Sequence, residues 1–458
     1  MSEGALGVDV GLSGVRATVV RDDGTLVATA RRGYRRQKRG GDIAEHDPRD
    51  WIEGMAAAGR EAVAGAPDVR ISAVGVAALG PAPVLVDAGL RALTNAPLFG
   101  LDRRAEQQRR RMTQGLVAEE AAGTLDNALP KLSWWRETEP ELADRAAWAL
   151  DATGFLVASL TGVAVMDTIT AADYELPGIE APFALPAPLD PAAVAGELGR
   201  GPAQDLGIAA GLPVVAGTYD SFVDIAAAGV RQPGDGGIVL GSTMIVCRAT
   251  EQAEPQHGLG VSGYPGTGIL LGGWTLCGGL VLDWFSDSIG GGRSQAELIG
   301  AARRVDSGGI LALPYLAGER TPLWDPNARA TLVGLSLDSG LEQIYRALVD
   351  SLAFVVRDHT ERIERVLGPC PAWRLTGGGT RNRLWVEATA DAVGAPLEVP
   401  TDAAEAVGPA LLALRALGFD PERRAATTVA PNPKRALYFD SMLPVFRGLP
   451  VLFKELQH

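Results

Sequence analysis

The sequence predicts an α/β fold made of two similar halves. Strand and helix signals alternate along most of the 458 residues. Near the start of each half, a strand enters a turn of glycine and hydroxyl residues and returns as a second strand. Because the chain exceeds the length of a typical single domain, we expect two domains, residues 1–231 and 232–458.

The first half opens with three predicted strands, residues 5–10, 15–20 and 25–31, which are separated by a glycine-rich turn and an Asp-Asp-Gly turn. A helix is predicted to follow over residues 47–64, with Asp47 as its N-cap and a proline at its first position. The run ISAVGVAA, which begins at Ile71, then has the character of a strand.

The second half repeats this arrangement. Strands are predicted at residues 236–240 and 244–249, and a Gln-Pro-Gly turn within residues 229–235 is expected to separate the domains. Further along, a strand at residues 373–376 enters three glycines and is followed by a helix over residues 382–393. The last helix that the sequence predicts runs over residues 402–417.

Composition excludes several classes of protein. The formal net charge of −13 disfavours nucleic acid as a partner, and the basic run from Arg31 to Arg39 is interpreted as a solvated loop, with anion binding as the alternative. Three scattered cysteines without a CxxC pair argue against a disulfide framework and a zinc site. Since neither a leader nor an apolar stretch of transmembrane length is found, we expect a soluble, cytoplasmic protein without a membrane partner.

The first glycine-hydroxyl turn is a candidate phosphate site. Gly11 and Ser13 are small enough for backbone amides to approach phosphate oxygens, and Arg16 follows closely on the second strand. Asp9, at the end of the first strand, is suited to Mg²⁺ directly or through water. The alternative is a plain hairpin in which this aspartate caps its own turn.

The second turn offers the same groups. Gly241, Ser242 and Thr243 provide a small residue and two hydroxyls that can donate to phosphate. An ordinary turn is the alternative, but the pairing with the first turn favours a phosphate site. Gly377, Gly378 and Gly379 leave room for a flat aromatic ligand, and the helix that follows them supplies free N–H groups.

Asp220 is the candidate general base. It follows the apolar strand at residues 213–216 and the sequence Gly-Thr-Tyr, at the strand end where α/β folds place ligands. Its carboxylate could accept the proton of a substrate hydroxyl during phosphoryl transfer. It could also cap the helix that begins near Ser221, and the two roles are compatible.

Other reaction classes lack their motifs. Neither GxxxxGK[ST] nor an early GxGxxG occurs, which disfavours a P-loop kinase and a nicotinamide enzyme. A GxSxG elbow is also missing, and none of the four histidines has a spaced partner for a metal site.

Taken together and in order, the motifs resemble those of the FGGY carbohydrate kinases over nearly the whole chain. The segments that carry the resemblance are VDVGLSGVRATVVRDDG, EHDPRDW, PVVAGTYDSFVDIAAAGVRQPGD, GSTMIV, LPYLAGERTPLWDPNARATLVGL and LTGGGTRNRLWVEATADAVGAPLEV. The resemblance implies an actin-like (ribonuclease H-like) ATPase fold in each domain and an interdomain cleft. It also implies ATP and Mg²⁺ as cofactors and a sugar or polyol as substrate.

The resemblance implies roles for individual residues. Asp220 would be the catalytic base and contact the sugar, Asp9 would help to place Mg²⁺, and Asp102 is a further sugar-binding candidate. Tyr219 stands where the family often has a smaller or different residue, and it either shapes the substrate pocket or only packs. Phosphate and adenosine contacts would come from Gly11, Ser13, Arg16, Gly241, Ser242, Thr243, Gly378, Gly379 and Asn382.

Two departures from the family pattern concern the acceptor. The family commonly has a glutamine followed by polar residues where this chain has Leu79, Gly80, Pro81 and Ala82, and a tryptophan where it has Gly100. These residues predict an apolar pocket wall, and hence an altered substrate or weak activity. The leading hypothesis is an ATP-dependent carbohydrate kinase. A nucleotide-dependent binding or sensor protein is the alternative, and a homodimer is left open.

Overall fold

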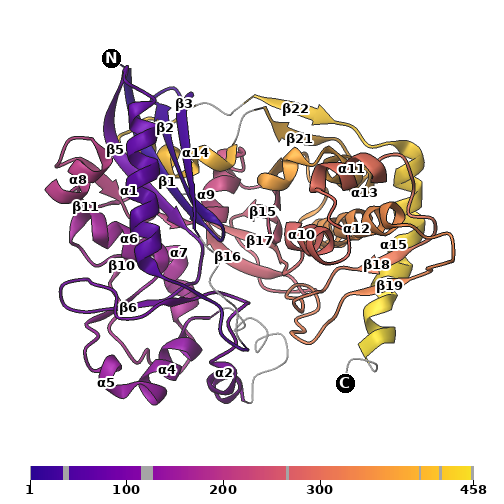
Figure 1. Cartoon of the computed structure of the whole chain (residues 1–458), viewed down its shortest axis with the longest axis horizontal. Coiled ribbons are helices and arrows are strands. Elements are labelled where there is room, and N and C mark those ends of the chain that lie inside the picture. Colours follow the sequence, from indigo (N-terminus) through magenta and orange to yellow (C-terminus); the bar gives the residue numbers. More distant parts are fainter. Residues whose placement is uncertain are drawn as a thin grey trace. The chain divides into compact units, whose positions relative to one another are not determined.

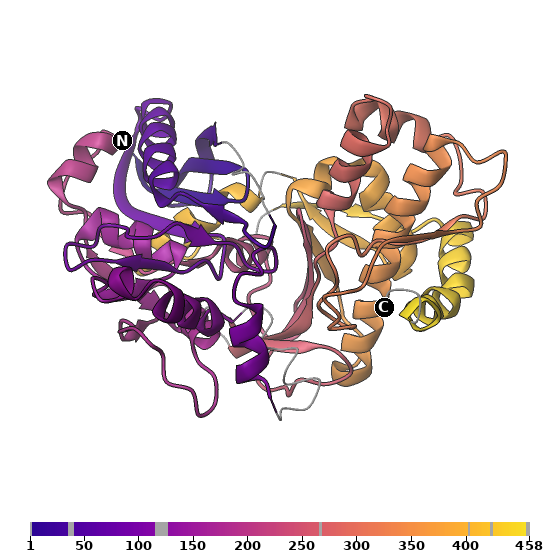
Figure 2. The same cartoon turned by 60° about the horizontal axis from the view of Figure 1, so that its bottom comes forward.

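The computed structural model describes residues 2–34, 41–114, 127–264, 268–401, 404–421 and 425–454. The chain divides into two compact units (Figure 1, Figure 2). Unit 1 consists of Met1–Ala227, Gly263–Gly266 and Ala403–Arg423. Unit 2 consists of Ala228–Ser262, Thr267–Asp402 and Arg424–His458.

Unit 1 is built on a mixed sheet whose strands follow the order β11-β12-β5-β1-β2-β3, with β13 also paired to β5. The first three strands form the antiparallel meander that the sequence predicts, and β5 and its neighbours β1, β12 and β13 are parallel. The strands are β1 (Ser2–Gly11), β2 (Gly14–Arg21), β3 (Leu26–Gly33), β5 (Val69–Ala78), β11 (Val194–Glu197), β12 (Pro213–Val215) and β13 (Thr218–Tyr219).

Helices cover both faces of this sheet. On one face α1 (Pro48–Ala64), α6 (Ala152–Thr161) and α8 (Arg200–Leu206) share a core with Leu6, Val8 and Val10 of β1. The prediction for α1 is confirmed, because the side chain of Asp47 accepts the Arg49 N–H at 2.9 Å as an N-cap. On the other face, α9 (Asp220–Ala227) and α14 (Ala404–Ala416) pack in a separate apolar cluster.

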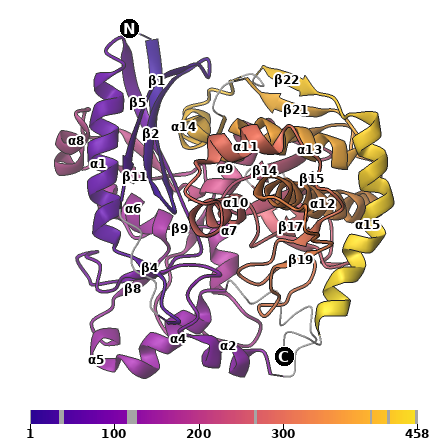
Figure 3. The same cartoon turned by 45° about the vertical axis from the view of Figure 1, so that its right-hand side comes forward.

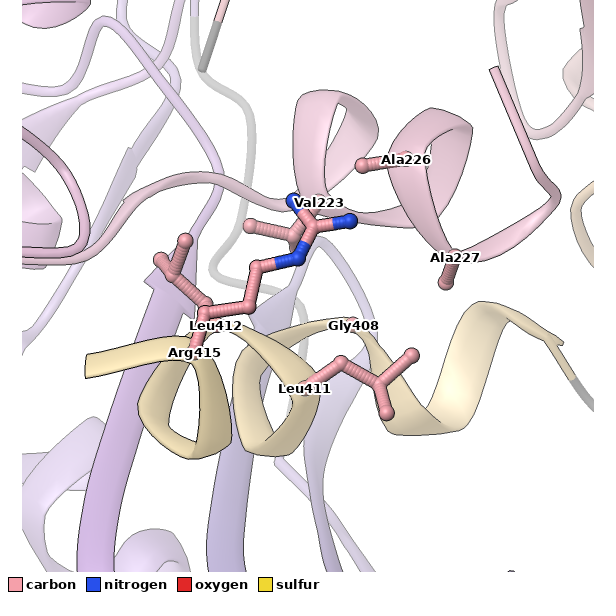
Figure 4. Close-up of a pocket in the computed structure, with 7 residues that line it drawn as sticks. All are labelled: Val223, Ala226, Ala227, Gly408, Leu411, Leu412 and Arg415. Atoms are coloured by element: carbon pink, nitrogen blue, oxygen red, sulfur yellow. The ribbon is translucent and has the colours of Figure 1, made fainter. Parts of the chain in front are cut away.

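The helix α14 comes from the C-terminal part of the chain and lies close to the unit 1 sheet, beside β1, β5 and α9. A Cβ on Gly7 would lie 2.5 Å from the Ala410 nitrogen, and a Cβ on Gly75 would overlap the Pro409 carbonyl. Figure 4 shows α14 against α9, with a small pocket between them that Arg415 borders. Glycines at these positions therefore let the helix approach the sheet at short range.

The remainder of unit 1 consists of short elements, most of which contribute to a separate core that includes Leu129, Trp135 and Tyr174. They are β4 (Glu45–His46), β6 (Val84–Val86), β7 (Ala96–Pro97), α2 (Glu106–Met112), α4 (Leu129–Thr138), α5 (Pro140–Ala143), β8 (Trp148–Leu150), β9 (Met166–Asp167), α7 (Thr168–Ala171), η1 (Ala172–Tyr174) and β10 (Pro188–Leu189).

Unit 2 has its own mixed sheet, in the order β16-β17-β15-β14-β20-β21-β22. Figure 3 shows its helices around this sheet, and one large core joins them to it. The strands are β14 (Gly236–Leu240), β15 (Met244–Thr250), β16 (Gly260–Tyr264), β17 (Gly268–Trp274), β20 (Trp373–Thr376), β21 (Leu397–Pro400) and β22 (Ala426–Val429), with β18 (Leu311–Leu313) and β19 (Thr331–Val333) as a separate pair. The helices are α10 (Gly279–Ser288), α11 (Gln295–Ala302), α12 (Leu341–Leu367), η2 (Gly378–Arg381), α13 (Arg383–Val393) and α15 (Pro433–Lys454).

The sequence predictions for β14, β15, β20 and α13 are confirmed, and Gly394 ends α13 in a left-handed conformation with φ of 71°. The prediction that the helix over residues 402–417 is the last one is wrong, because α15 follows it. Pro444 and Pro450 lie inside α15, and proline normally argues against a helix interior. Packing compensates for the lost hydrogen bonds: Phe439 and Phe446 lie 4.7 and 5.1 Å from the ring of Phe354.

No helix in the described ranges is both long enough and apolar enough to span a bilayer.

Candidate active site

In unit 1 the two predicted carboxylates lie at the same edge of the sheet. Asp9 on β1 and Thr218 on β13 are both register partners of Ala77, from opposite sides of β5. Asp220 comes two residues later, where β13 ends and α9 begins. Since these strands are parallel, their carboxyl ends meet where α/β sheets bind ligands.

Tyr34 lies within the electrostatic reach of both carboxylates. Its hydroxyl donates a hydrogen bond to the carbonyl of Gly11 in the first turn. Burial raises the pKa of Tyr34, and the charges of Asp9 and Asp220 raise it further. Sequence reasoning missed this residue, because a tyrosine just past the end of a strand carries no pattern that separates a site residue from a packing one.

The environment of Asp220 suits a base. Burial raises its pKa to about 6, and the hydrogen bond that its Oδ1 accepts from the Ser221 N–H at 2.6 Å opposes that shift. A carboxylate with this pKa is ionised at neutral pH and is more basic than an exposed aspartate. Asp220 can therefore take up a proton near neutral pH.

The first turn is held by contacts along its hairpin. Asp9 stands opposite Arg16 in the ladder of β1 and β2, and Gly11 stands opposite Gly14. A Cβ on Gly11 would meet only a carbonyl oxygen at 3.9 Å, so the space beside this glycine is open. The turn thus has the small, accessible backbone that a phosphate needs.

Arg31 contacts this turn. It lies on β3, and its Nη2 donates to the Oγ of the exposed Ser13 at 3.0 Å. The interpretation of the basic run as a solvated loop is therefore wrong for Arg31 and Arg32, which both lie on β3. Arg35, Arg36, Lys38 and Arg39 of that run lie outside the described residues.

In unit 2 the second turn joins β14 to β15. Its ends are closed by a hydrogen bond from the Gly241 N–H to the Thr243 carbonyl at 3.0 Å. The N–H groups of Gly279 and Leu280, at the start of α10, donate to the carbonyls of Gly241 and Ser242. The turn is thus anchored to α10, while the side chain of Ser242 stays exposed.

The structure brings the three glycines next to this turn. They follow β20, the parallel neighbour of β14. A Cβ on Gly377 or Gly379 would lie 2.7 Å from the Leu240 carbonyl, at the end of β14, so packing requires glycine at both positions. A Cβ on Gly378 would meet only the guanidinium of Arg381 within 4 Å. Asn382 follows as the N-cap of α13. The nucleotide-site residues predicted in the second half therefore lie in the two segments that follow β14 and β20.

Two comparisons of the chain with family models identify its family. The N-terminal domain of the FGGY family of carbohydrate kinases matches residues 5–227, and the C-terminal domain of the same family matches residues 236–417. The chain belongs to the FGGY family of carbohydrate kinases. It is therefore a carbohydrate kinase, as the resemblance of its motifs predicted, and ATP as its phosphate donor follows from the family.

Named relatives agree with this family. The xylulose kinase of Bacillus subtilis is 25% identical over 448 residues, which cover 90% of this chain and 88% of that enzyme. The glycerol kinase of Alkalilimnicola ehrlichii is 36% identical over 178 residues, 38% of this chain and 36% of that enzyme. The crystal structure of a gluconate kinase from Lactobacillus acidophilus superposes with a TM-score of 0.86 at 20% identity, over 99% of this chain and 98% of that one. The predicted two-domain α/β kinase fold is thereby confirmed.

Asp9 is the candidate carboxylate of this kinase for a magnesium ion. Among the residues that the structure describes, no group of three or more His, Cys, Asp or Glu side chains could hold a metal by themselves. Mg²⁺ beside a nucleotide usually takes one or two carboxylates and completes its shell with phosphates and water. Asp9, partly exposed beside the first turn, fits that requirement.

Asp102 is engaged by neighbours in unit 1. Its buried carboxylate accepts the Ala44 N–H at 2.8 Å and pairs with Arg104 at 2.8 Å, and Arg104 also contacts Glu45. A buried charge needs such partners. These contacts explain Asp102 as a structural residue of the kinase, and its role in sugar binding stays a prediction.

The expected apolar pocket wall is corrected by the structure. Leu79 and Ala82 are at most 1% exposed and belong to the core around β1 and β5. Apolar side chains at these positions therefore stabilise the fold. Tyr219 is also buried, and its hydroxyl donates to Asp173 Oδ2 at 2.9 Å.

Proposed function

We propose that this kinase transfers the terminal phosphate of ATP to a hydroxyl of a small sugar, ketose or sugar alcohol, with Asp220 as the general base. The observation that carries the proposal is the placement of Asp9 and Asp220 on either side of β5, both close enough to act on Tyr34. One carboxylate is then available for a cation and the other for a proton.

In this proposal, unit 1 acts on the acceptor. Asp220 accepts the proton of the attacking hydroxyl as the oxygen bonds to phosphorus, and its raised pKa matches that task near neutral pH. Asp9 helps to hold Mg²⁺, which neutralises phosphate charge when it is bound. Gly11 and Ser13 bind phosphate oxygens, and Arg16 adds a positive charge beside Asp9.

Unit 2 supplies the nucleotide contacts. Phosphate oxygens bind the turn of Gly241, Ser242 and Thr243, since its small residue and hydroxyls suit an anion. Adenosine lies against Gly378, Gly379 and Asn382. The adjacency of both segments at the ends of β14 and β20 supports one continuous nucleotide surface in this unit.

The acceptor is proposed only as a class. The relatives are named for xylulose, glycerol and gluconate, which share vicinal hydroxyls and differ in length and charge. In addition to Asp220, Asp102 and Tyr219 are candidate residues for contacts to the acceptor. The alternative of a binding or sensor protein rests on the apolar residues Leu79–Ala82, and the burial of Leu79 and Ala82 gives these two side chains a role in the core.

Replacement of Asp220 by Asn tests the proposal. We expect phosphoryl transfer to fall by at least about 100-fold, because the base is lost, while ATP still binds. ADP release with a panel of pentuloses, hexuloses, alditols and aldonates measures the first effect, and calorimetry with ATP measures the second.

Asp205→Asn is the matched control. This side chain is 65% exposed and pairs with Arg60 at 3.8 Å, so activity should be unchanged. Retained turnover in Asp220→Asn would contradict the role of Asp220. Failure of every acceptor to raise ADP release by the wild-type protein would favour the binding or sensor protein.

A further inference from the structure

Beside Asp220, a tyrosine ring fills a recess whose walls are polar. We propose that Tyr219 determines acceptor specificity by occupying this recess and so limiting the length of the molecule that Asp220 can serve. This inference rests on the proposed function of Asp220. Three features of the recess support the proposal: the glycine against which the ring packs, the polar residues that surround the ring, and the place of the recess in the sheet.

The glycine is Gly80. A Cβ at this position would overlap Cε1 of the Tyr219 ring, so the ring occupies the space that a larger residue would fill. The ring is only 6% exposed and makes a tilted contact with Phe222 at 5.9 Å. Gly80 and Tyr219 are thus complementary in size, and neither can be enlarged alone.

The walls carry carboxylates. Asp151 is 1% exposed, and its Oδ2 would lie 3.0 Å from a Cβ on Gly80. Its Oδ1 accepts hydrogen bonds from the Ala82 N–H and the Tyr174 hydroxyl, both at 2.8 Å. Within the described residues, its Oδ2 has no hydrogen-bond partner.

A second carboxylate holds the tyrosine in place, because Asp173 accepts the Tyr219 hydroxyl at 2.9 Å. Removal of the ring would remove the hydrogen bond to Asp173 and expose the unpartnered oxygen of Asp151. Carboxylate oxygens accept hydrogen bonds from hydroxyls. The emptied recess would therefore have the chemistry of a subsite for additional hydroxyl groups of a longer polyol.

The recess lies at the edge of the sheet that holds the base. Tyr219 pairs with Ala78, the last residue of β5, and Gly80 follows two residues later. Asp220 is the next residue after Tyr219 along the chain. A short acceptor with one hydroxyl at Asp220 would then avoid the tyrosine ring, whereas a longer acceptor in the same position would collide with it.

The first test compares acceptors of different length. In Tyr219→Ala, the ratio of kcat/KM for sorbitol to kcat/KM for glycerol should rise at least about tenfold over wild type, since steric fit in a pocket discriminates on that scale. Tyr219→Phe keeps the ring and removes only the bond to Asp173, so its ratio should match wild type. An unchanged ratio in Tyr219→Ala would overturn the proposal.

The second test measures the affinity for sorbitol by calorimetry, which does not require turnover. Tyr219→Ala should bind sorbitol more tightly than the wild-type protein does, and equal or weaker binding in this variant would contradict the recess even if no acceptor is phosphorylated. Absence of turnover with all acceptors, together with tighter binding, would instead count against the proposed phosphoryl transfer and leave the recess supported.

The contact itself is tested by stability. Gly80→Ala should lower Tm in the wild-type background, because the new methyl group overlaps the ring, and should have a smaller effect in the Tyr219→Ala background. An equal loss in both backgrounds would show that the ring does not rest on Gly80. This measurement also applies if Tyr219→Ala is less stable than wild type.

Discussion

At the scale of single residues, burial determines the chemistry of the proposed base. Asp220 lies at the same end of the sheet as Asp9, and burial raises the pKa of Asp220 to about 6. Desolvation disfavours the charged form, so Asp220 binds a proton more readily than an exposed aspartate does. The sequence shows that an aspartate follows the strand, but the degree of burial depends on segments distant in the chain.

This pKa predicts how the reaction depends on pH. The base must be ionised to accept a proton, so activity should be half-maximal near pH 6, approach its maximum about one pH unit higher, and fall at lower pH as Asp220 becomes protonated. A profile of kcat/KM against pH measures this limb in the free enzyme. A limb near 4, the value of an exposed aspartate, would contradict the environment described for Asp220.

At the scale of elements, the approach of α14 to α9 supports the position of the base. Asp220 is the first residue of α9, and this helix packs against α14 where Gly408 faces the backbone of Val223 (Figure 4). A Cβ on Gly408 would lie 2.7 Å from the Val223 carbonyl oxygen. The spacing between the two helices therefore depends on this glycine.

Replacement of Gly408 by Ala should destabilise the protein by about 1–3 kcal/mol, because the added methyl group overpacks a backbone contact. It should also lower kcat, since α9 carries Asp220. Chemical unfolding and initial rates measure the two effects.

Gly448→Ala is the matched control, because its new Cβ meets no atom within 4 Å. This helix position should gain up to about 1 kcal/mol from the higher helix propensity of alanine. Equal stability and equal kcat in the two variants would show that the contact between α14 and α9 does not depend on Gly408.

At the scale of the whole molecule, unit 1 is completed by a segment from far along the chain. Residues 403–423 belong to it, and α14 covers the sheet face formed by Ala5, Val20, Ala73 and Ala77. Without this helix, an apolar face would be open to water. The N-terminal 227 residues thus lack one layer of their own fold.

A fragment of residues 1–227 is therefore expected to be insoluble or to unfold without cooperativity. The same fragment with residues 403–423 joined through a flexible linker should be more soluble and melt cooperatively, because the helix covers the exposed face. Soluble yield and thermal circular dichroism compare the two. Cooperative melting of the shorter fragment at an equal Tm would contradict this account.

Local patterns were sufficient for much of the fold. The meander of β1 to β3, the cap of α1 at Asp47 and the end of α13 at Gly394 follow from alternation, capping and glycine signals that act over a few residues. The helix α15 was missed because its prolines oppose a local rule that aromatic packing against Phe354 outweighs.

The sequence by itself determined the strands, the two glycine-hydroxyl turns, Asp9 and Asp220 as candidates, and the kinase family. Only the tertiary structure showed that Tyr34 lies near both carboxylates, that Leu79 and Ala82 are core residues, and that Tyr219 rests on Gly80. The reason is physical: hydrogen-bonding and capping preferences act between near neighbours, whereas burial and steric fit depend on residues that meet only after the chain has folded.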